Sequence, residues 1–193
     1  MSTPLTIKTA TYQDASSIAH IQIAGWRASY QNIVPEPHLK TLSASAKTAF
    51  WQSILIDPVQ AEEVLVAQRR HDENSSSDQS GPQILGFATF GSADDPSALE
   101  SDAEATVKEA RKGELRAIYV DPQHFSEGVG RCLWLAAREK MVERGYSTVV
   151  VWVFAGNDRA MRFYRKAGFT ESQTGQTEVG GATVVTIQLS KKL

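Results

Sequence analysis

The sequence has little cysteine, little net charge and no long apolar run, and each absence excludes a class of protein. Its one cysteine, Cys132, excludes an intrachain disulfide framework and is typical of a reducing compartment. The formal net charge of −2 gives no general electrostatic attraction to nucleic acid or to an anionic membrane. No stretch approaches membrane-spanning length, and the N-terminus MSTPLTIKTA has no apolar signal-peptide core. We therefore expect a cytoplasmic protein.

Histidine is also sparse, and its spacing forms no set of metal ligands, so we expect no metal site. The four histidines are His20, His38, His71 and His124. The chain has 193 residues, of which 41% are hydrophobic and 22% charged, which is ordinary for one globular domain. We expect a single domain over residues 1–193, with polar insertions at about 71–82 and 92–112.

The hydrophobic pattern predicts a mixed α/β domain with elements in the order β-α-α-β-β-β-α-β-α-β-β. The expected strands are Leu5–Ala10, Glu63–Gln68, Gln83–Phe90, Leu115–Val120, Thr148–Phe154, Phe169–Gln173 and Thr183–Leu189. The first expected helix begins near Tyr12, after a Thr11 cap, and ends before Pro35. Further helices are expected over Ala46–Ile56, Gly128–Arg144 and Asp158–Lys166, with a short one around Ala103–Ala110.

The most informative segment joins the expected strand Leu115–Val120 to a helix that begins near Gly128 and Gly130. The first N–H groups of a helix have no intrahelical partner, and the helix dipole favours negative charge at that end. Glycines allow a phosphate to approach the backbone closely. The segment therefore points to a phosphorylated cofactor, although two glycines at a helix start are more often a tight turn. Both interpretations stay open on this segment alone.

A second motif, NDRAMRFYRKAGF at Asn157–Phe169, adds a family resemblance. Together with IYVDPQHFSEGVGRCL and the element order, it resembles the GNAT superfamily of acetyl-CoA-dependent N-acetyltransferases. The N-terminal stretch IAHIQIAGWRASYQNIVPEPHLKTL is similar to the acceptor-side helices of many members. The resemblance implies a mixed, mostly antiparallel central sheet with helices on both faces. It also implies that the fourth and fifth strands splay apart.

The implied activity is transfer of an acetyl group from acetyl-CoA, a co-substrate, to an amine. The resemblance implies direct transfer through a tetrahedral intermediate, without a metal. The acceptor is expected to be a small molecule or a peptide, and the oligomeric state, including a homodimer, is open. The residues implied at the cofactor are Ile118, Val120, Ser126, Gly128, Val129, Gly130, Arg131, Asn157 and Tyr164.

Two side chains are expected to move protons. An alkyl amine has a pKa of about 10.4 and must lose a proton before it attacks a thioester. The resemblance makes Glu114 the candidate base, and a solvated side chain at the start of a strand is the alternative for this residue. The departing thiolate needs a proton, and the resemblance places Tyr164 as the general acid. Trp26 and Tyr30, one helical turn apart, either line the acceptor pocket or pack in the core. Cys132 could carry a covalent acetyl group, but its helical position predicts packing instead.

The first motif departs from the family pattern at three positions. Phe125 replaces Gln or Arg, Ser126 replaces a common Gly, and Glu127 replaces a common basic residue. We expect Glu127 to point into solvent, because its charge would otherwise repel the phosphates. These departures leave a non-catalytic acyl-CoA-binding or sensing domain as the alternative function. A dinucleotide-binding enzyme is disfavoured because the segment lacks the full Gly-x-Gly-x-x-Gly pattern.

Overall fold

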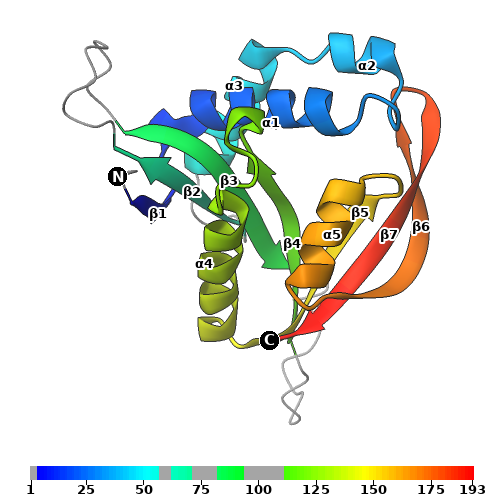
Figure 1. Ribbon diagram of the computed structural model, residues 1–193. Helices are drawn as coiled ribbons and strands as arrows, with labels where there is room; N and C mark the ends of the chain where they lie inside the picture. Colours follow the sequence, from blue (N-terminus) through cyan, green and yellow to red (C-terminus); the bar gives the residue numbers. More distant parts are fainter. Residues whose placement is uncertain (1–3, 57–61, 71–81, 94–110) are drawn as a thin grey trace. The chain divides into compact units, whose positions relative to one another are not determined.

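A computed structural model describes residues 4–56, 62–70, 82–93 and 111–193 (Figure 1). The strands are β1 Leu5–Thr9, β2 Glu63–Arg69, β3 Gln83–Ser92, β4 Arg111–Val120, β5 Tyr146–Phe154, β6 Thr170–Val179 and β7 Ala182–Lys192. They form a seven-stranded sheet in the order β1-β2-β3-β4-β5-β7-β6. β1 pairs antiparallel with β2, and β7 pairs antiparallel with both β5 and β6, while β4 and β5 run parallel. The expected mixed, mostly antiparallel sheet is confirmed.

The expected helices in the described residues are also present. The α-helices are α1 Ala15–Ser29, α2 Glu36–Lys40, α3 Ala44–Ile56, α4 Val129–Glu143 and α5 Asp158–Lys166, and the short 3₁₀-helices are η1 Tyr12–Asp14 and η3 Pro122–His124. The helix expected around 103–110 lies outside the described residues, as does most of both polar insertions. β4 begins at Arg111, so the second polar segment is slightly shorter than expected.

The helix α2 is an element that the sequence did not predict. Proline usually ends a helix, but in a first turn its missing N–H costs nothing and its fixed φ suits the helix. Pro37 occupies such a position at the start of α2. At the other end, the Arg27 guanidinium donates to the carbonyl oxygens of Leu39 and Leu42, both at 3.4 Å. These hydrogen bonds fasten the end of α2 to α1.

The contacts between residues divide the chain into two compact units. Unit 1 comprises Met1–Gly25, Ser43–Thr89 and Ala117–Ala137, and unit 2 comprises Trp26–Leu42, Phe90–Arg116 and Arg138–Leu193. The expectation of a single domain stays a prediction.

Unit 1 has an apolar core built from α1, α3 and the inner strands. Its buried members are Ala15, Ile18, Ala19, Ile21, Trp51, Val64, Val66 and Phe87. The start of the first helical segment is fixed by Asp14, whose carboxylate accepts from the Thr11 backbone N–H at 2.8 Å and from Lys8 at 2.7 Å. The expected cap at Thr11 therefore works partly in reverse, because the Asp14 side chain satisfies the N–H of Thr11.

Gly86 on β3 allows the end of β4 and the start of α4 to approach the sheet closely. A Cβ at this position would lie 2.7 Å from the backbone oxygen of Tyr119, and 3.1 and 3.2 Å from methyl groups of Val129 and Leu133. Val129 and Leu133 are themselves fully buried. The absence of a side chain at Gly86 thus sets where α4 begins relative to the strands beneath it.

Unit 2 contains the long hairpin of β6 and β7, which pairs with β5 and extends beyond the expected strand ends (Figure 1). The turn of the hairpin reaches α2, because a Cβ at Gly180 would lie 2.5 Å from the Cβ of His38. Within β5, Val149, Val150, Val151 and Val153 are buried, as the apolar run predicts.

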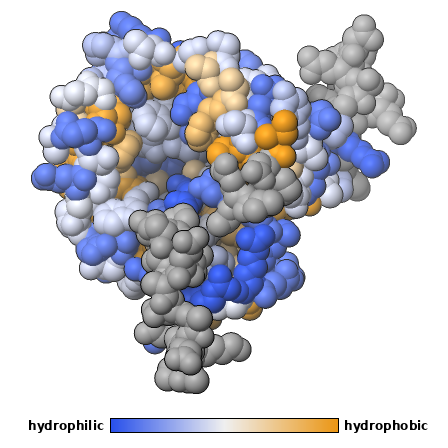
Figure 2. All heavy atoms as spheres, turned by 180° about the vertical axis from the view of Figure 1, so that it is seen from behind, coloured by the Kyte–Doolittle hydropathy of each residue, from blue (hydrophilic) through white to orange (hydrophobic). Residues whose placement is uncertain are grey.

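On the face shown in Figure 2, apolar residues form small groups between hydrophilic ones. The large apolar side chains that are exposed among the described residues are Tyr12, Phe50, Ile56, Leu135, Val142, Trp152 and Val185. None of the described helices is both long enough and apolar enough to cross a membrane.

We predict that Gly86→Ala lowers the free energy of unfolding by about 1–3 kcal/mol, the usual cost of overpacking a core. The added methyl group meets the backbone oxygen of Tyr119, which cannot rotate away. Urea denaturation measures the change. Gly86→Ala should lower the free energy of unfolding by the same amount when it is introduced into a Leu133→Val protein, because the smaller side chain leaves the backbone oxygen of Tyr119 in place. Recovery in the Leu133→Val background would contradict the backbone explanation.

Candidate active site

The parallel pairing of β4 with β5 is short. It covers Arg111–Glu114 on β4 and ends at the pair Glu114 and Val150, although β4 continues to Val120 and β5 to Phe154. No further β4–β5 partners occur among the described residues. This is the splay expected between the fourth and fifth strands. The candidate cofactor residues Ile118 and Val120 are half-buried and lie on β4 beyond the paired segment.

The β4–α4 turn, residues 121–128, follows directly. Asp121 anchors it, since its N–H donates to the Leu85 oxygen at 2.8 Å and its carboxylate accepts from the Gln123 N–H at 3.0 Å. Ser126 and Gly128 both have left-handed backbone conformations, with φ of 69° and 86°. A Cβ at Gly128 would meet no atom within 4 Å among the described residues. The backbone on this side of the turn is therefore open to a ligand.

The turn delivers the chain to the N-terminus of α4. The Cys132 N–H donates to the Gly128 oxygen at 3.0 Å, which is the first hydrogen bond of the helix. The preceding N–H groups, at Val129, Gly130 and Arg131, have no acceptor within the helix. Val129 is buried, Gly130 half-buried and Arg131 exposed. This end of α4 can accept an anion through its backbone.

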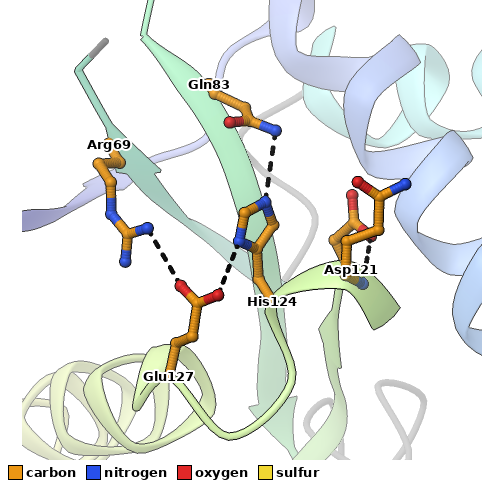
Figure 3. A network of polar contacts seen from close by, with 6 residues as sticks. Arg69, Gln83, Asp121, His124 and Glu127 are labelled. Carbon is orange, nitrogen blue, oxygen red and sulfur yellow. Dashed lines mark hydrogen bonds and ion pairs between the residues drawn. The ribbon is translucent and has the colours of Figure 1, made fainter. Parts of the chain in front are cut away.

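The Glu127 side chain is held by two partners (Figure 3). One carboxylate oxygen accepts from Arg69 Nη1 at 3.1 Å, and the other lies 3.2 Å from His124 Nδ1. The hydrogen bond from Arg69, followed by that from His124, lowers the pKa of Glu127. The expectation that Glu127 points into solvent is half right. Its side chain is 39% exposed, but its carboxylate is bound to β2 and η3.

The same contacts determine the proton arrangement of neutral His124. Ionised Glu127 can only accept, so Nδ1 carries the proton in that contact. On the other side, His124 Nε2 lies 3.5 Å from Gln83 Nε2, which can only donate. A neutral imidazole with its proton on Nδ1 satisfies both neighbours.

Tyr164, the candidate acid, lies on α5 and is buried. Its ring packs edge-on against Phe163 at 5.1 Å and Phe169 at 5.4 Å between centroids. Burial raises the pKa of Tyr164 well above its ordinary value, and interaction with Tyr30 adds to the increase. The hydroxyl therefore keeps its proton at neutral pH.

Glu114, the candidate base, lies on β4 with a half-buried side chain. Its carboxylate accepts from Arg116 Nη1 at 3.2 Å, and the Arg116 guanidinium also donates to the Ser92 oxygen at 3.4 Å. A fixed cation thus stands beside this carboxylate and balances its negative charge. Tyr164 and Glu114 belong to the same unit but have different neighbours.

Trp26 and Tyr30 belong to an aromatic cluster that also includes His38 and Phe154. Trp26 lies 5.1 Å from Tyr30, 6.0 Å from His38 and 6.1 Å from Phe154, while Tyr30 and Phe154 are 4.9 Å apart, all between ring centroids. The rings pack on one another, as core residues do. Trp26 Nε1 is buried and has no hydrogen-bond partner within the described segments.

Asn157 and Cys132 have clear structural positions. The Asn157 side-chain oxygen accepts from the Ala160 N–H at 3.1 Å, so Asn157 caps α5 and its amide NH₂ is not used by that bond. Cys132 is half-buried on α4, which is less than the full packing expected for it.

The candidate residues fall into the two compact units of the chain. Ser126, Gly128 and Val129 lie in unit 1, whereas Tyr164, Tyr30 and the other cluster residues lie in unit 2. The sequence did not indicate the roles of Arg69, His124, His38 and Phe154. Arg69 and Glu127 are 58 positions apart, so no local spacing could have paired them. No group of three or more potential metal ligands occurs among the described residues.

Comparison with known proteins decides the family. The sequence model of the acetyltransferase (GNAT) family matches residues 36–169, which is more than half of the chain. The chain belongs to this family. Membership confirms the expected enzyme class, an N-acetyltransferase.

Individual relatives agree with this assignment. The N-acetyltransferase YuaI of Bacillus subtilis is 29% identical over 153 residues, which cover 79% of this chain and 73% of YuaI. A GCN5-related N-acetyltransferase from Rhodopseudomonas palustris has a similar fold, with a TM-score of 0.68 and 19% identity over 100% of this chain and 98% of that one. NAA60 from Arabidopsis thaliana, solved in complex with acetyl-CoA, also has a similar fold, with a TM-score of 0.68 and 13% identity. The match covers 98% of this chain and 99% of NAA60.

We predict that the buried hydroxyl of Tyr164 makes the fold less stable at high pH. Above about pH 10 the unfolded chain releases the Tyr164 proton while the folded chain retains it, so unfolding becomes more favourable as pH rises. The stability advantage of the wild type over Tyr164→Phe should therefore shrink between neutral pH and about pH 10.5. Urea midpoints of both proteins measure it, and the other tyrosines cancel in the difference. A constant difference would contradict the burial of this hydroxyl.

Proposed function

We propose that this enzyme transfers the acetyl group of acetyl-CoA directly to the amine of a small molecule or a peptide, through a tetrahedral intermediate. The observation that carries the proposal is the β4–α4 turn. Its left-handed Gly128 stands at the start of α4, and no atom of the described chain occupies the space beside it. This is the arrangement that a diphosphate needs from a protein backbone.

Acetyl-CoA fits this turn through backbone groups. The N–H groups of Val129, Gly130 and Arg131 would donate to the phosphate oxygens, and the dipole of α4 would favour their charge. Phe125 offers no polar side chain, so the backbone carries more of the recognition than in relatives with Gln or Arg there. Ser126 can add its hydroxyl. Ile118 and Val120, on β4 beyond its pairing with β5, would line the path of the pantetheine arm. Asn157 is also proposed at the cofactor, because its amide NH₂ is not used by the cap of α5.

The acceptor must attack as a neutral amine. Glu114 would take the proton that the amine releases, directly or through a water molecule. Glu114 would act as a temporary acceptor that passes the proton to solvent. The amine nitrogen forms a bond to the acetyl carbon as the carbonyl electrons move onto oxygen.

Collapse of this intermediate breaks the carbon–sulfur bond and leaves a thiolate. Tyr164 would donate its proton to that sulfur and recover one from solvent. Burial raises the pKa of this hydroxyl, so at neutral pH it holds a proton that it can donate. In a low-dielectric site a hydrogen bond to a developing anion is stronger than in water, which favours the transition state. The transfer needs no acetylated Cys132.

The aromatic cluster would determine which acceptors the enzyme prefers. Trp26 and Tyr30 pack with Phe154, which favours an apolar or aromatic portion of the acceptor beside the amine. A non-catalytic acyl-CoA-binding domain is the alternative, and Phe125 and Glu127 are the residues that favour it. Turnover of acetyl-CoA with a panel of amines separates these functions, because the alternative predicts binding without release of CoA.

We predict that acetyl-CoA raises the melting temperature of the wild type and that Gly128→Val abolishes this shift. The valine side chain would fill the open space and strain a left-handed backbone. Gly145→Val is the matched control, because Gly145 has φ of 79° and also has open space around its Cβ position. Both variants should lose similar stability, but the control should keep its acetyl-CoA shift. An unchanged acetyl-CoA affinity in folded Gly128→Val would exclude this site.

We predict that Tyr164→Phe and Glu114→Gln lose activity in different ways. Tyr164→Phe keeps the packed ring, so acetyl-CoA affinity should survive while turnover falls about 10²–10⁴-fold, the scale of general acid–base catalysis. Glu114→Gln should lose most at low pH, where the amine is protonated, and less as pH rises. Steady-state kinetics across pH measure both variants. Near-normal turnover by Tyr164→Phe, or a Glu114→Gln deficit independent of pH, would exclude the corresponding role.

A further inference from the structure

The conformation of the β4–α4 turn is unfavourable for its sequence. Ser126 has φ of 69°, in the left-handed region that residues with a side chain rarely adopt. Within the described residues it is the only one other than glycine with a positive φ. Such a residue persists where the surrounding structure fixes it, and the cost is of the order of 1 kcal/mol or more. Some contact must therefore hold this turn.

Glu127 supplies the contact. It stands between Ser126 and Gly128 in the sequence, so bonds to its side chain also restrain these two residues. One oxygen of its carboxylate is bound by Arg69, the last residue of β2, and the other by His124 in η3 (Figure 3). The Arg69 side chain is 23% exposed and that of His124 19%, so both partners are anchored against the protein. Gln83 on β3 approaches the far side of the His124 ring. The carboxylate thus connects the turn directly to β2 and, through the His124 ring, to β3.

We propose that Glu127 is a positioning residue, whose bonds to Arg69 and His124 hold the turn so that its backbone N–H groups can bind the phosphates of acetyl-CoA. This inference rests on the proposed function. An acidic residue beside a phosphate site would ordinarily weaken binding by repulsion. Here the guanidinium of Arg69 balances the charge and keeps the carboxylate bound on the side of β2.

The proposal and simple repulsion predict opposite changes in CoA affinity for one variant. Glu127→Gln removes the negative charge but keeps the shape of the side chain. Its NH₂ group must face either Arg69 or His124. Arg69 can only donate, and His124 donates in the Nδ1–H tautomer, so one of the two bonds is lost while His124 keeps that tautomer. If the charge mainly repels the phosphates, this variant binds CoA more tightly. If the carboxylate holds the turn, it binds CoA more weakly.

The test is isothermal calorimetry of CoA with wild type, Glu127→Gln, Arg69→Gln and the double variant. We expect each single variant to raise the Kd for CoA about three- to tenfold. The Kd of the double variant should not exceed the higher of the two single-variant values. Arg69→Lys, which keeps the charge, should recover part of the loss. Glu139→Gln on the exposed side of α4 is the matched control and should bind like the wild type. Tighter binding by Glu127→Gln, or fully additive losses, would overturn the proposal.

A second measurement does not need the cofactor. Hydrogen exchange of the ligand-free proteins reports how often the turn opens, and Glu127→Gln should speed exchange of the amides at 125–130 several-fold over the wild type. Glu139→Gln should not. Unchanged exchange in Glu127→Gln would overturn the positioning role. If exchange quickens but the wild type binds no CoA, the positioning role stands and the proposed function fails.

Discussion

The close approach at Gly86 is the constraint on which the β4–α4 turn depends. At this residue the backbone of β4 and two buried side chains of α4 all lie where a side chain would otherwise stand. The end of β4 and the beginning of α4 are thereby fixed against β3. The turn between them must bridge these two fixed points within a few residues, and it does so with left-handed conformations at Ser126 and Gly128. The open backbone at the helix start follows from this packing.

The proposed recognition of acetyl-CoA by the backbone would explain how the turn tolerates unusual side chains. Phe125 can add no side-chain hydrogen bond, but the N–H groups of a helix start are present in any sequence that forms the turn. The acidic Glu127 would be a liability if it were free. Bound to Arg69 and His124, it is neutralised and also connected to the sheet. A substitution that looks unfavourable in the motif alone is accommodated by a partner far away in the sequence.

The sequence predicted best what local chemistry determines. α5 has the expected bounds because Asn157 caps its start and Gly168, with φ of 87°, follows its end. It predicted less well what distant contacts determine. β6 is longer than expected because its polar residues are held by the ladder to β7, which hydrophobic periodicity does not report. α2 was missed because two prolines normally signal a loop, and the contact of Arg69 with Glu127 left no local trace.

Burial of Tyr164 would both serve and limit the catalytic role that we propose for it. Removal of its hydroxyl from water raises its pKa, so the group remains a proton donor under all ordinary conditions. The same shift makes it a weaker acid than a solvated tyrosine, and protonation of a thiolate becomes less favourable. The low dielectric offsets this loss, because it strengthens a hydrogen bond to the developing sulfur anion before the proton moves. A buried tyrosine is therefore suited to stabilise the departing thiolate first and to protonate it afterwards.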